Sequence, residues 1–137
     1  MKLSISQDNL LQLIQHAQEG YPHEVVGILA GEPQTHTVHV VHPLINEKGT
    51  THNRYKVSAL ALMSAEQALE EQGHTILGYY HSHPDHSAQY SEYDREHALP
   101  NMSYLIISVH QGVFSHIQSW RLQEDRTAMD LEPLNII

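Results

Sequence analysis

This chain contains no cysteine, and that absence limits how it can be stabilised. With 137 residues and no Cys, it forms no disulfide, thiolate zinc site or iron–sulfur cluster, and it has no Cys nucleophile. A hydrophobic core must hold the fold, and 40% hydrophobic against 17% charged residues is ordinary for a globular protein. Because the composition does not shift along the chain, we expect a single domain over residues 1–137. Any metal site must be built from carboxylates and from the 13 histidines.

The charge balance argues against two classes of partner. The formal net charge is -9, from 16 acidic and 7 basic residues. Nucleic acids and anionic membranes are bound by clustered Lys and Arg, which are scattered here. The first residues, MKLSISQDNLLQL, lack a basic region followed by an apolar run, and no stretch approaches ~18 apolar residues. We therefore expect a cytoplasmic protein without nucleic-acid or membrane partners.

Hydrophobic periodicity predicts alternating helices and strands. Helical spacing predicts amphipathic helices over 6–19 and 58–72, each behind a serine and ended by a glycine, with Gly20 in the left-handed conformation. Strand patterns predict extended segments over 25–30, 37–44, 75–81, 103–109, 113–122 and near 129–134, and a short helix opening at Ser91. The stretch 46–53 is predicted to be a polar loop before an extended piece at 54–57. The order predicts a mixed α/β sandwich around one sheet, with the first two strands paired as a hairpin.

The residues with the clearest chemistry are His81 and His83. Residues two apart on a strand point to the same face, so both imidazoles can face one point. Asp94, in the following short helix, can add a carboxylate, and two His with one carboxylate leave the open position of a catalytic zinc site. An H-x-H pair alone is weak evidence, and Ser91 with Asp94 also has the spacing of a helix capping box. The two interpretations of Asp94 are compatible, since capping leaves one carboxylate oxygen free.

An acidic residue at the entry to the first strand completes the pattern. Glu24 stands within YPHEVVGILAG, directly before an apolar run. Taken together, this segment, HSHP at 81–84 and S-x-x-D at 91–94 resemble the JAMM motif of the MPN-plus zinc metalloproteases. That motif reads Glu, a long gap, then H-[ST]-H-P-x6-S-x2-D. The four elements match in order and spacing between residues 21 and 94.

The resemblance implies a fold, a reaction and a role for each matching residue. The implied fold is of the MPN type, similar to cytidine deaminases: a mixed sheet with two main helices and a short helix at the metal site. His81, His83 and Asp94 would bind one catalytic Zn2+. Glu24 would take a proton from the attacking water and deliver it to the leaving amine, and Ser91 would hydrogen-bond the oxyanion. The small prokaryotic members imply a substrate with a C-terminal Gly-Gly, a ubiquitin-like or sulfur-carrier protein, cut at a peptide or isopeptide bond.

One departure and three alternatives remain open at this point. The family often has proline before the motif serine, whereas this chain has Tyr90, which would alter the loop or line the cleft. A non-catalytic protein-binding scaffold, a histidine-rich metal buffer and a DNA-repair relative are the alternatives; the acidic charge disfavours the last. We expect an extended substrate to dock along residues 44–55, beside a predicted edge strand.

Overall fold

The computed structural model describes residues 2–47 and 57–137. The elements are β1 (Leu3–Ile5), α1 (Gln7–Gly20), β2 (Val26–Glu32), β3 (Thr37–Leu44), α2 (Ala59–Glu71), β4 (Thr75–Pro84), α3 (Glu92–His97), β5 (Ser103–His110), β6 (Val113–Leu122), β7 (Met129–Glu132) and β8 (Leu134–Ile136). Three predictions fall largely outside the described residues. They are the loop over 46–53, the docking edge over 44–55 and the extended piece at 54–57, of which only the last residue is described.

The strands form one mixed sheet in the order β7-β6-β5-β4-β2-β3-β1-β8. β2 is antiparallel to both β3 and β4, whereas β4 and β5 run parallel. The β2–β3 pairing confirms the predicted hairpin, and the mixed sheet with its helices confirms the predicted α+β class. β4 lies near the middle of the sheet, so its residues are held by a strand on each side.

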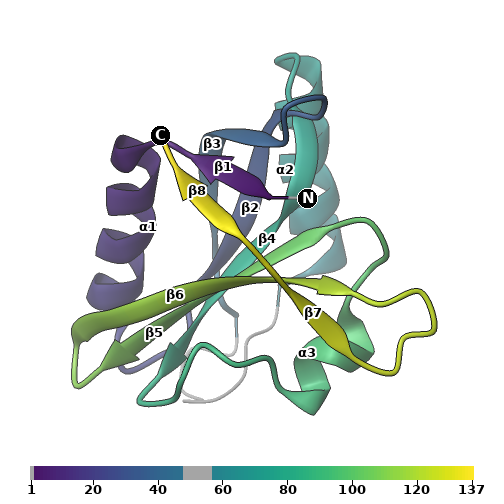
Figure 1. Cartoon of the computed structure of the whole chain (residues 1–137). Helices are drawn as coiled ribbons and strands as arrows, with labels where there is room; N and C mark the ends of the chain where they lie inside the picture. The colour runs from purple at the N-terminus through teal and green to yellow at the C-terminus, as the bar shows by residue number, and fades with distance from the viewer. Residues whose placement is uncertain (1, 48–56) are drawn as a thin grey trace.

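The two long helices cover opposite faces of this sheet (Figure 1). Leu13 of α1 lies in the same core cluster as Leu29. Leu69 of α2 lies in another core cluster with Ile28. Because successive residues of a strand point to opposite faces, these two neighbours on β2 serve two separate cores.

The two outermost strands of the sheet order, β7 and β8, are consecutive in the sequence. Only Pro133 separates them, yet β7 pairs with β6 and β8 pairs with β1. The sheet must therefore curl until its ends meet, and in Figure 1 the yellow β7–β8 segment crosses diagonally in front of the other strands. Backbone hydrogen bonds fasten this closure to β1, from Leu3 N to Pro133 O (2.9 Å) and from Ile137 N to Ile5 O (2.9 Å).

The helix ends follow the sequence signals with one exception. The Ser6 and Ser58 hydroxyls accept hydrogen bonds from backbone amides at the starts of α1 and α2, and Gly73 ends α2 at φ +91°. The prediction for Gly20 was wrong, because it belongs to the helix and has no positive φ. A Cβ at Gly20 would lie 2.2 Å from Cγ1 of Val25, so close packing accounts for this glycine.

Candidate metal centre and active site

The structure brings together the three residues expected to bind metal. β4 continues to Pro84, three residues beyond the predicted end, so both His81 and His83 lie on the strand and face the same side. Their Nε2 atoms are 3.2 Å apart. Asp94 of α3 approaches both, with Oδ1 3.1 Å from His81 Nε2 and Oδ2 3.3 Å from His83 Nε2. All three side chains are buried, and their ligand atoms lie within 4.8 Å of one another.

A capping box orients Asp94. The Ser91 hydroxyl accepts from the Asp94 amide (3.1 Å), and Asp94 Oδ2 accepts from the Ser91 amide (2.8 Å). Oδ1 takes no part in this exchange. The capping interpretation and the ligand geometry therefore coexist, because the cap uses one carboxylate oxygen and leaves the other directed at His81.

A backbone carbonyl fixes the ring of His83. Its Nδ1 lies 2.8 Å from the Ser87 carbonyl oxygen, which only accepts hydrogen bonds, so in the neutral ring Nδ1 carries the hydrogen. Nε2 then presents its lone pair toward His81 and Asp94. This arrangement of an outer hydrogen bond and an inner ligand atom is typical of metal-binding histidines. Sequence reasoning missed Ser87, since it acts through its main chain and leaves no trace in residue type.

Electrostatics in this cluster favour an ionised Asp94. Burial raises the pKa of Asp94, but hydrogen bonds from His81, His83 and the Ser91 amide hold it well below its usual range. For His83, burial lowers the pKa, while the hydrogen bonds to Asp94 and to the Ser87 carbonyl raise it more, and the net shift is upward. The buried, ionised Asp94 therefore favours a positive charge beside it, which a protonated imidazole or a bound cation would supply.

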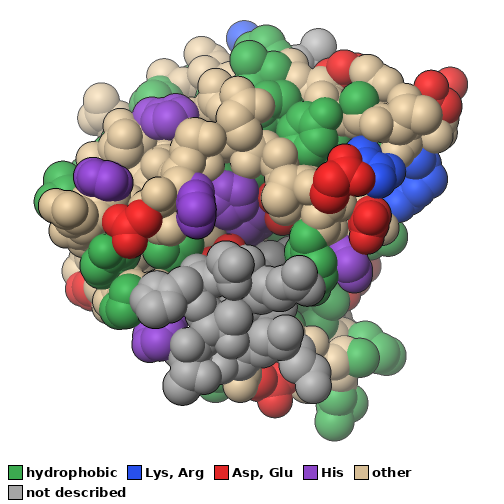
Figure 2. Space-filling model, turned by 90° about the horizontal axis from the view of Figure 1, so that it is seen from below, with side chains coloured by type: hydrophobic (Ala, Val, Ile, Leu, Met, Phe, Trp, Pro, Cys, Tyr) green, Lys and Arg blue, Asp and Glu red, His purple; other side chains and the backbone are tan. Residues whose placement is uncertain are grey.

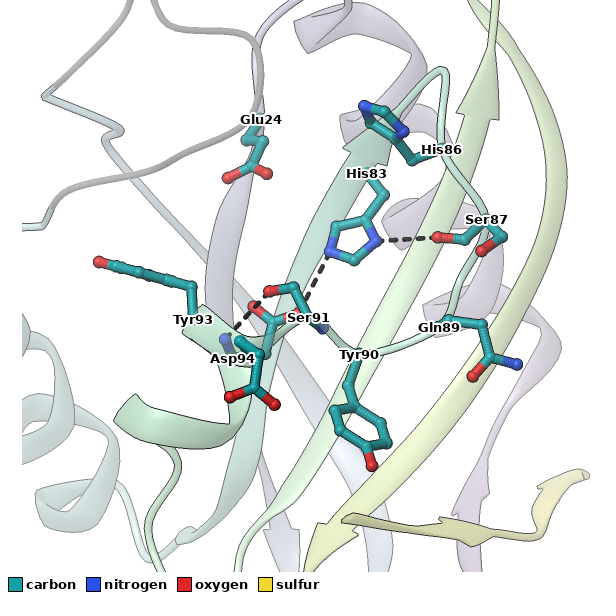
Figure 3. Close-up of a pocket in the computed structure, with 10 residues that line it drawn as sticks. Glu24, His83, His86, Ser87, Gln89, Tyr90, Ser91, Tyr93 and Asp94 are labelled. Atoms are coloured by element: carbon teal, nitrogen blue, oxygen red, sulfur yellow. Dashed lines mark hydrogen bonds and ion pairs between the residues drawn. The ribbon is translucent and has the colours of Figure 1, made fainter. Parts of the chain in front are cut away.

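The cluster opens into a cleft of about 420 Å³, lined in part by Glu24, His83, Tyr90, Ser91 and Asp94. Figure 3 shows Glu24 on the segment before β2, with its carboxylate directed into the cleft that His83 and Asp94 also line. Glu24 is only 5% exposed, so a carboxyl group is held at the edge of the core. The molecular face in Figure 2 bears several histidine side chains with carboxylates among them.

Ser82, between the two histidines, braces the chain next to Glu24. Its hydroxyl accepts from the Val25 amide (2.9 Å), and its own amide donates to the Val25 carbonyl (3.0 Å). Asn46 adds a side-chain hydrogen bond to the Glu24 carbonyl (2.7 Å). Alternation along β4 directs Ser82 to the face opposite His81 and His83. Ser82 therefore braces the chain beside Glu24 and does not face the histidine cluster.

The wall of the cleft is a short loop fastened to β5 and β6. Ser108 donates to the His86 carbonyl (2.5 Å), and Trp120 Nε1 donates to the Ala88 carbonyl (2.9 Å). Tyr90 lines the cleft and packs edge-on against Trp120, with ring centroids 5.0 Å apart. Tyr90 is thus anchored by aromatic packing at the position where the family often has proline.

The remaining histidines do not form a second site in the part of the chain that the structure describes. Across residues 2–47 and 57–137, His81, His83 and Asp94 are the only group of three potential ligands that converge. The histidine-rich metal buffer, which predicts several ions per chain, finds no support among these residues. The same residues include no helix that is both long and apolar enough to span a bilayer.

Two strand histidines and a helix carboxylate at a cleft of a mixed α+β domain form a three-ligand metal site of the open, catalytic kind. The family described as prokaryotic homologs of the JAB domain matches residues 6–123, and the chain belongs to this Prok-JAB family. The predicted resemblance to the JAMM proteins is confirmed.

Two curated relatives agree with this assignment, and two solved structures share the fold. The chain is 34% identical over 120 residues to a desampylase of Haloferax volcanii, covering 84% of this chain and 86% of the relative. It is 36% identical over 91 residues to a probable TtuB-protein conjugate cleaving protease of Thermus thermophilus, covering 66% and 60%. A solution structure from Desulfitobacterium hafniense superposes with a TM-score of 0.84 at 24% identity, covering 98% of this chain and 92% of that one. A structure described as a metalloprotease-like zinc site in the proteasome and signalosome gives 0.62 at 14% identity, covering 100% and 99%.

Proposed function

We propose that this protein is a zinc-dependent isopeptidase or peptidase that cuts after the C-terminal Gly-Gly of a ubiquitin-like or sulfur-carrier protein. The observation that carries the proposal is the convergence of His81, His83 and Asp94 at the edge of a cleft that Glu24 also enters. The relatives' names, a desampylase and a conjugate cleaving protease, support the reaction class. The Gly-Gly tail is the expectation carried by the JAMM resemblance. A cytoplasmic location belongs to the same proposal and is tested by cell fractionation.

The donor set fits zinc. Two imidazole nitrogens and one carboxylate oxygen are three protein ligands, which leaves the fourth tetrahedral position for substrate or water, as in catalytic zinc sites. The buried Asp94 carboxylate supplies the negative charge that such an ion requires. When bound, zinc would act as a Lewis acid on the scissile carbonyl and make water a nucleophile near neutral pH.

The chain's own residues would then move the protons. Glu24 takes a proton from the water whose oxygen attacks the scissile carbonyl carbon, and it delivers this proton to the nitrogen as the C–N bond breaks. The Ser91 hydroxyl accepts from the Asp94 amide and still has its own hydrogen to donate to the carbonyl oxygen as negative charge develops there. The products are an amine and a carboxylic acid, which at neutral pH become an ammonium and a carboxylate as the second water proton is transferred.

Purified protein loaded with zinc tests the proposal with two substrates. In one, the Gly-Gly of a ubiquitin-like protein continues into a short peptide; in the other, it is joined to a lysine side chain. We expect cleavage after the second glycine, detected by mass spectrometry. Glu24→Gln should retain one zinc per chain and lose about 10²-fold or more in kcat. His81→Ala should lose the zinc, and Glu32→Gln, at the far end of β2, should behave like the parent protein.

Three results would contradict the proposal. One is a zinc-loaded protein that cuts neither substrate. Another is full activity in Glu24→Gln, which would show that Glu24 is not the general base. The third is absence of stoichiometric zinc after zinc is supplied. If, in addition, Glu24→Gln leaves the affinity for a protein partner unchanged, the two results together would favour the non-catalytic scaffold.

A further inference from the structure

Two hydrogen-bonded links join the segment that carries Glu24 to the segment that carries the histidines. One is the Ser82 hydroxyl to the Val25 amide, one residue after Glu24. The other joins Tyr21, three residues before Glu24, to Asp85, two residues after His83: the phenol hydroxyl donates to Asp85 Oδ2 at 2.7 Å. Glu24 is therefore spanned on both sides by links to the end of β4.

The second link is exposed to solvent, and further hydrogen bonds hold its carboxylate in place. Asp85 Oδ1 accepts from the Gln111 amide (2.8 Å), and the Asp85 amide donates to the Val109 carbonyl (2.7 Å). Asp85 itself has φ +60°, a conformation that non-glycine residues adopt rarely. The Tyr21 ring packs against the main core cluster and passes close to Gly112 in the β5–β6 turn. One carboxylate thus joins three segments: the end of α1, the end of β4 and the turn after β5.

We infer that Tyr21 is a positioning residue, whose hydroxyl, held by Asp85, sets the place of Glu24 relative to His81 and His83. The inference rests on the proposed function, because it concerns the proton-transfer geometry of that reaction. A displacement of about 1 Å in a reacting group can cost 10²-fold in rate. Tyr21 acts only through the chain that it holds, and not by contact with the substrate or the metal ligands.

Tyr21→Phe tests the inference because it removes the hydroxyl and keeps the ring. We expect kcat to fall about tenfold, with KM and zinc content little changed. The double variant Tyr21→Phe/Glu24→Gln should be no slower than Glu24→Gln alone, since a group acting through Glu24 has no effect once the base is gone. In the metal-free protein, amide hydrogen exchange at residues 23–25 should quicken in Tyr21→Phe and in Asp85→Ala.

Tyr79→Phe is the matched control. The Tyr79 hydroxyl also donates to a carboxylate, that of Glu66, but this pair joins β4 to α2. Its loss should leave kcat and the exchange at 23–25 unchanged. The inference is overturned if exchange at 23–25 is the same in Tyr21→Phe as in the parent, or if the losses of the double variant multiply. A parent protein that fails to cut any Gly-Gly substrate, while exchange quickens as expected, would refute the proposed function and retain the Tyr21 coupling.

Discussion

Ser91 shows how one side chain can serve folding and chemistry together. Its hydroxyl oxygen accepts from the Asp94 amide at the start of α3, and its hydroxyl hydrogen can be donated to an acceptor in the cleft. The cap also sets the direction of Asp94, so the residue expected to stabilise the oxyanion is the one that orients a metal ligand. Stability and catalysis at this position can be separated only by comparison with an equivalent cap elsewhere.

Ser58 provides that comparison. Its hydroxyl accepts from the Ala61 amide (3.0 Å) at the start of α2. We expect Ser91→Ala and Ser58→Ala each to lower the free energy of unfolding by about 1 kcal/mol, the usual cost of a lost N-cap. Ser91→Ala alone should also lower kcat, by about 10²-fold. Urea unfolding and cleavage assays give the two numbers; equal activity in both variants would assign Ser91 to capping only.

Those parts of the candidate site that consist of side chains could be predicted from residue types. Motif order and spacing indicated His81, His83 and Asp94, and the structure brings these three together. The Ser87 carbonyl and the Tyr21–Asp85 hydrogen bond could not be predicted, because they depend on the backbone path and on contacts between residues 64 positions apart. Their roles in catalysis, like that of Glu24, stay predictions.

At the scale of elements, β4 has to do two things along one strand. It pairs with β5 from Gly78 to Pro84, and its end presents the two histidines. The close packing is most evident at Gly78, which pairs with Ser103: a Cβ there would lie 1.9 Å from the Ser103 carbonyl oxygen. No side chain fits at that separation, so the glycine permits the parallel pairing that carries the site.

Gly78→Ala should therefore push β4 from β5. We expect the free energy of unfolding to fall by about 2 kcal/mol, in the range for overpacking, and zinc affinity to weaken because the histidines follow on the same strand. Gly73→Ala is the control: its Cβ meets open space, so only the φ of +91° costs stability, about 1 kcal/mol. Urea unfolding measures the stability of each variant, and zinc titration measures its zinc affinity. Unchanged zinc affinity in Gly78→Ala would show that the metal site does not depend on the close pairing of β4 with β5.

The long elements were predictable from periodicity, and the short ones were not. Both long helices and the hairpin follow from apolar spacing and caps. β1 and β8 have three residues each and are strands because they pair with each other and β1 with β3. β4 was predicted too short, since polar residues at 82 and 83 resemble a loop in sequence yet keep their pairing with β5 through Pro84.

At the scale of the molecule, a buried carboxylate stands where the sheet closes. Glu132, the last residue of β7, is 4% exposed. Its Oε1 accepts from the Ser103 and Ser119 hydroxyls at 2.7 and 2.8 Å, and its Oε2 lies 3.3 Å from Arg121 Nη1 and 3.5 Å from His36 Nε2. These partners come from β5, β6 and the β2–β3 turn, so one side chain connects strands that are far apart in the sheet order.

The charge of Glu132 should make the closure depend on pH. Burial raises the pKa of Glu132, but hydrogen bonds from His36, Ser103 and Ser119 and the charge of Arg121 lower it more, and the net shift is downward from 4.5. A carboxyl group with a lowered pKa stabilises the fold above its unfolded pKa, and that stability is lost as the pH falls through the folded value. The contribution should be complete at pH 7 and absent in strong acid.

Glu132→Gln keeps an acceptor for the serines and removes the charge. We expect the free energy of unfolding at pH 7 to fall by about 1–3 kcal/mol, as for hydrogen bonds to a charged group. The difference from the parent protein should begin to shrink once the pH falls below the ordinary pKa of a glutamate, where the unfolded parent chain binds a proton, and it should vanish when the folded carboxylate is protonated too. Glu124→Gln, at an exposed carboxylate of the β6–β7 turn, controls for net charge. Urea unfolding from pH 7 to pH 3 measures both, and a constant difference across this range would show that the Glu132 charge does not hold the closure.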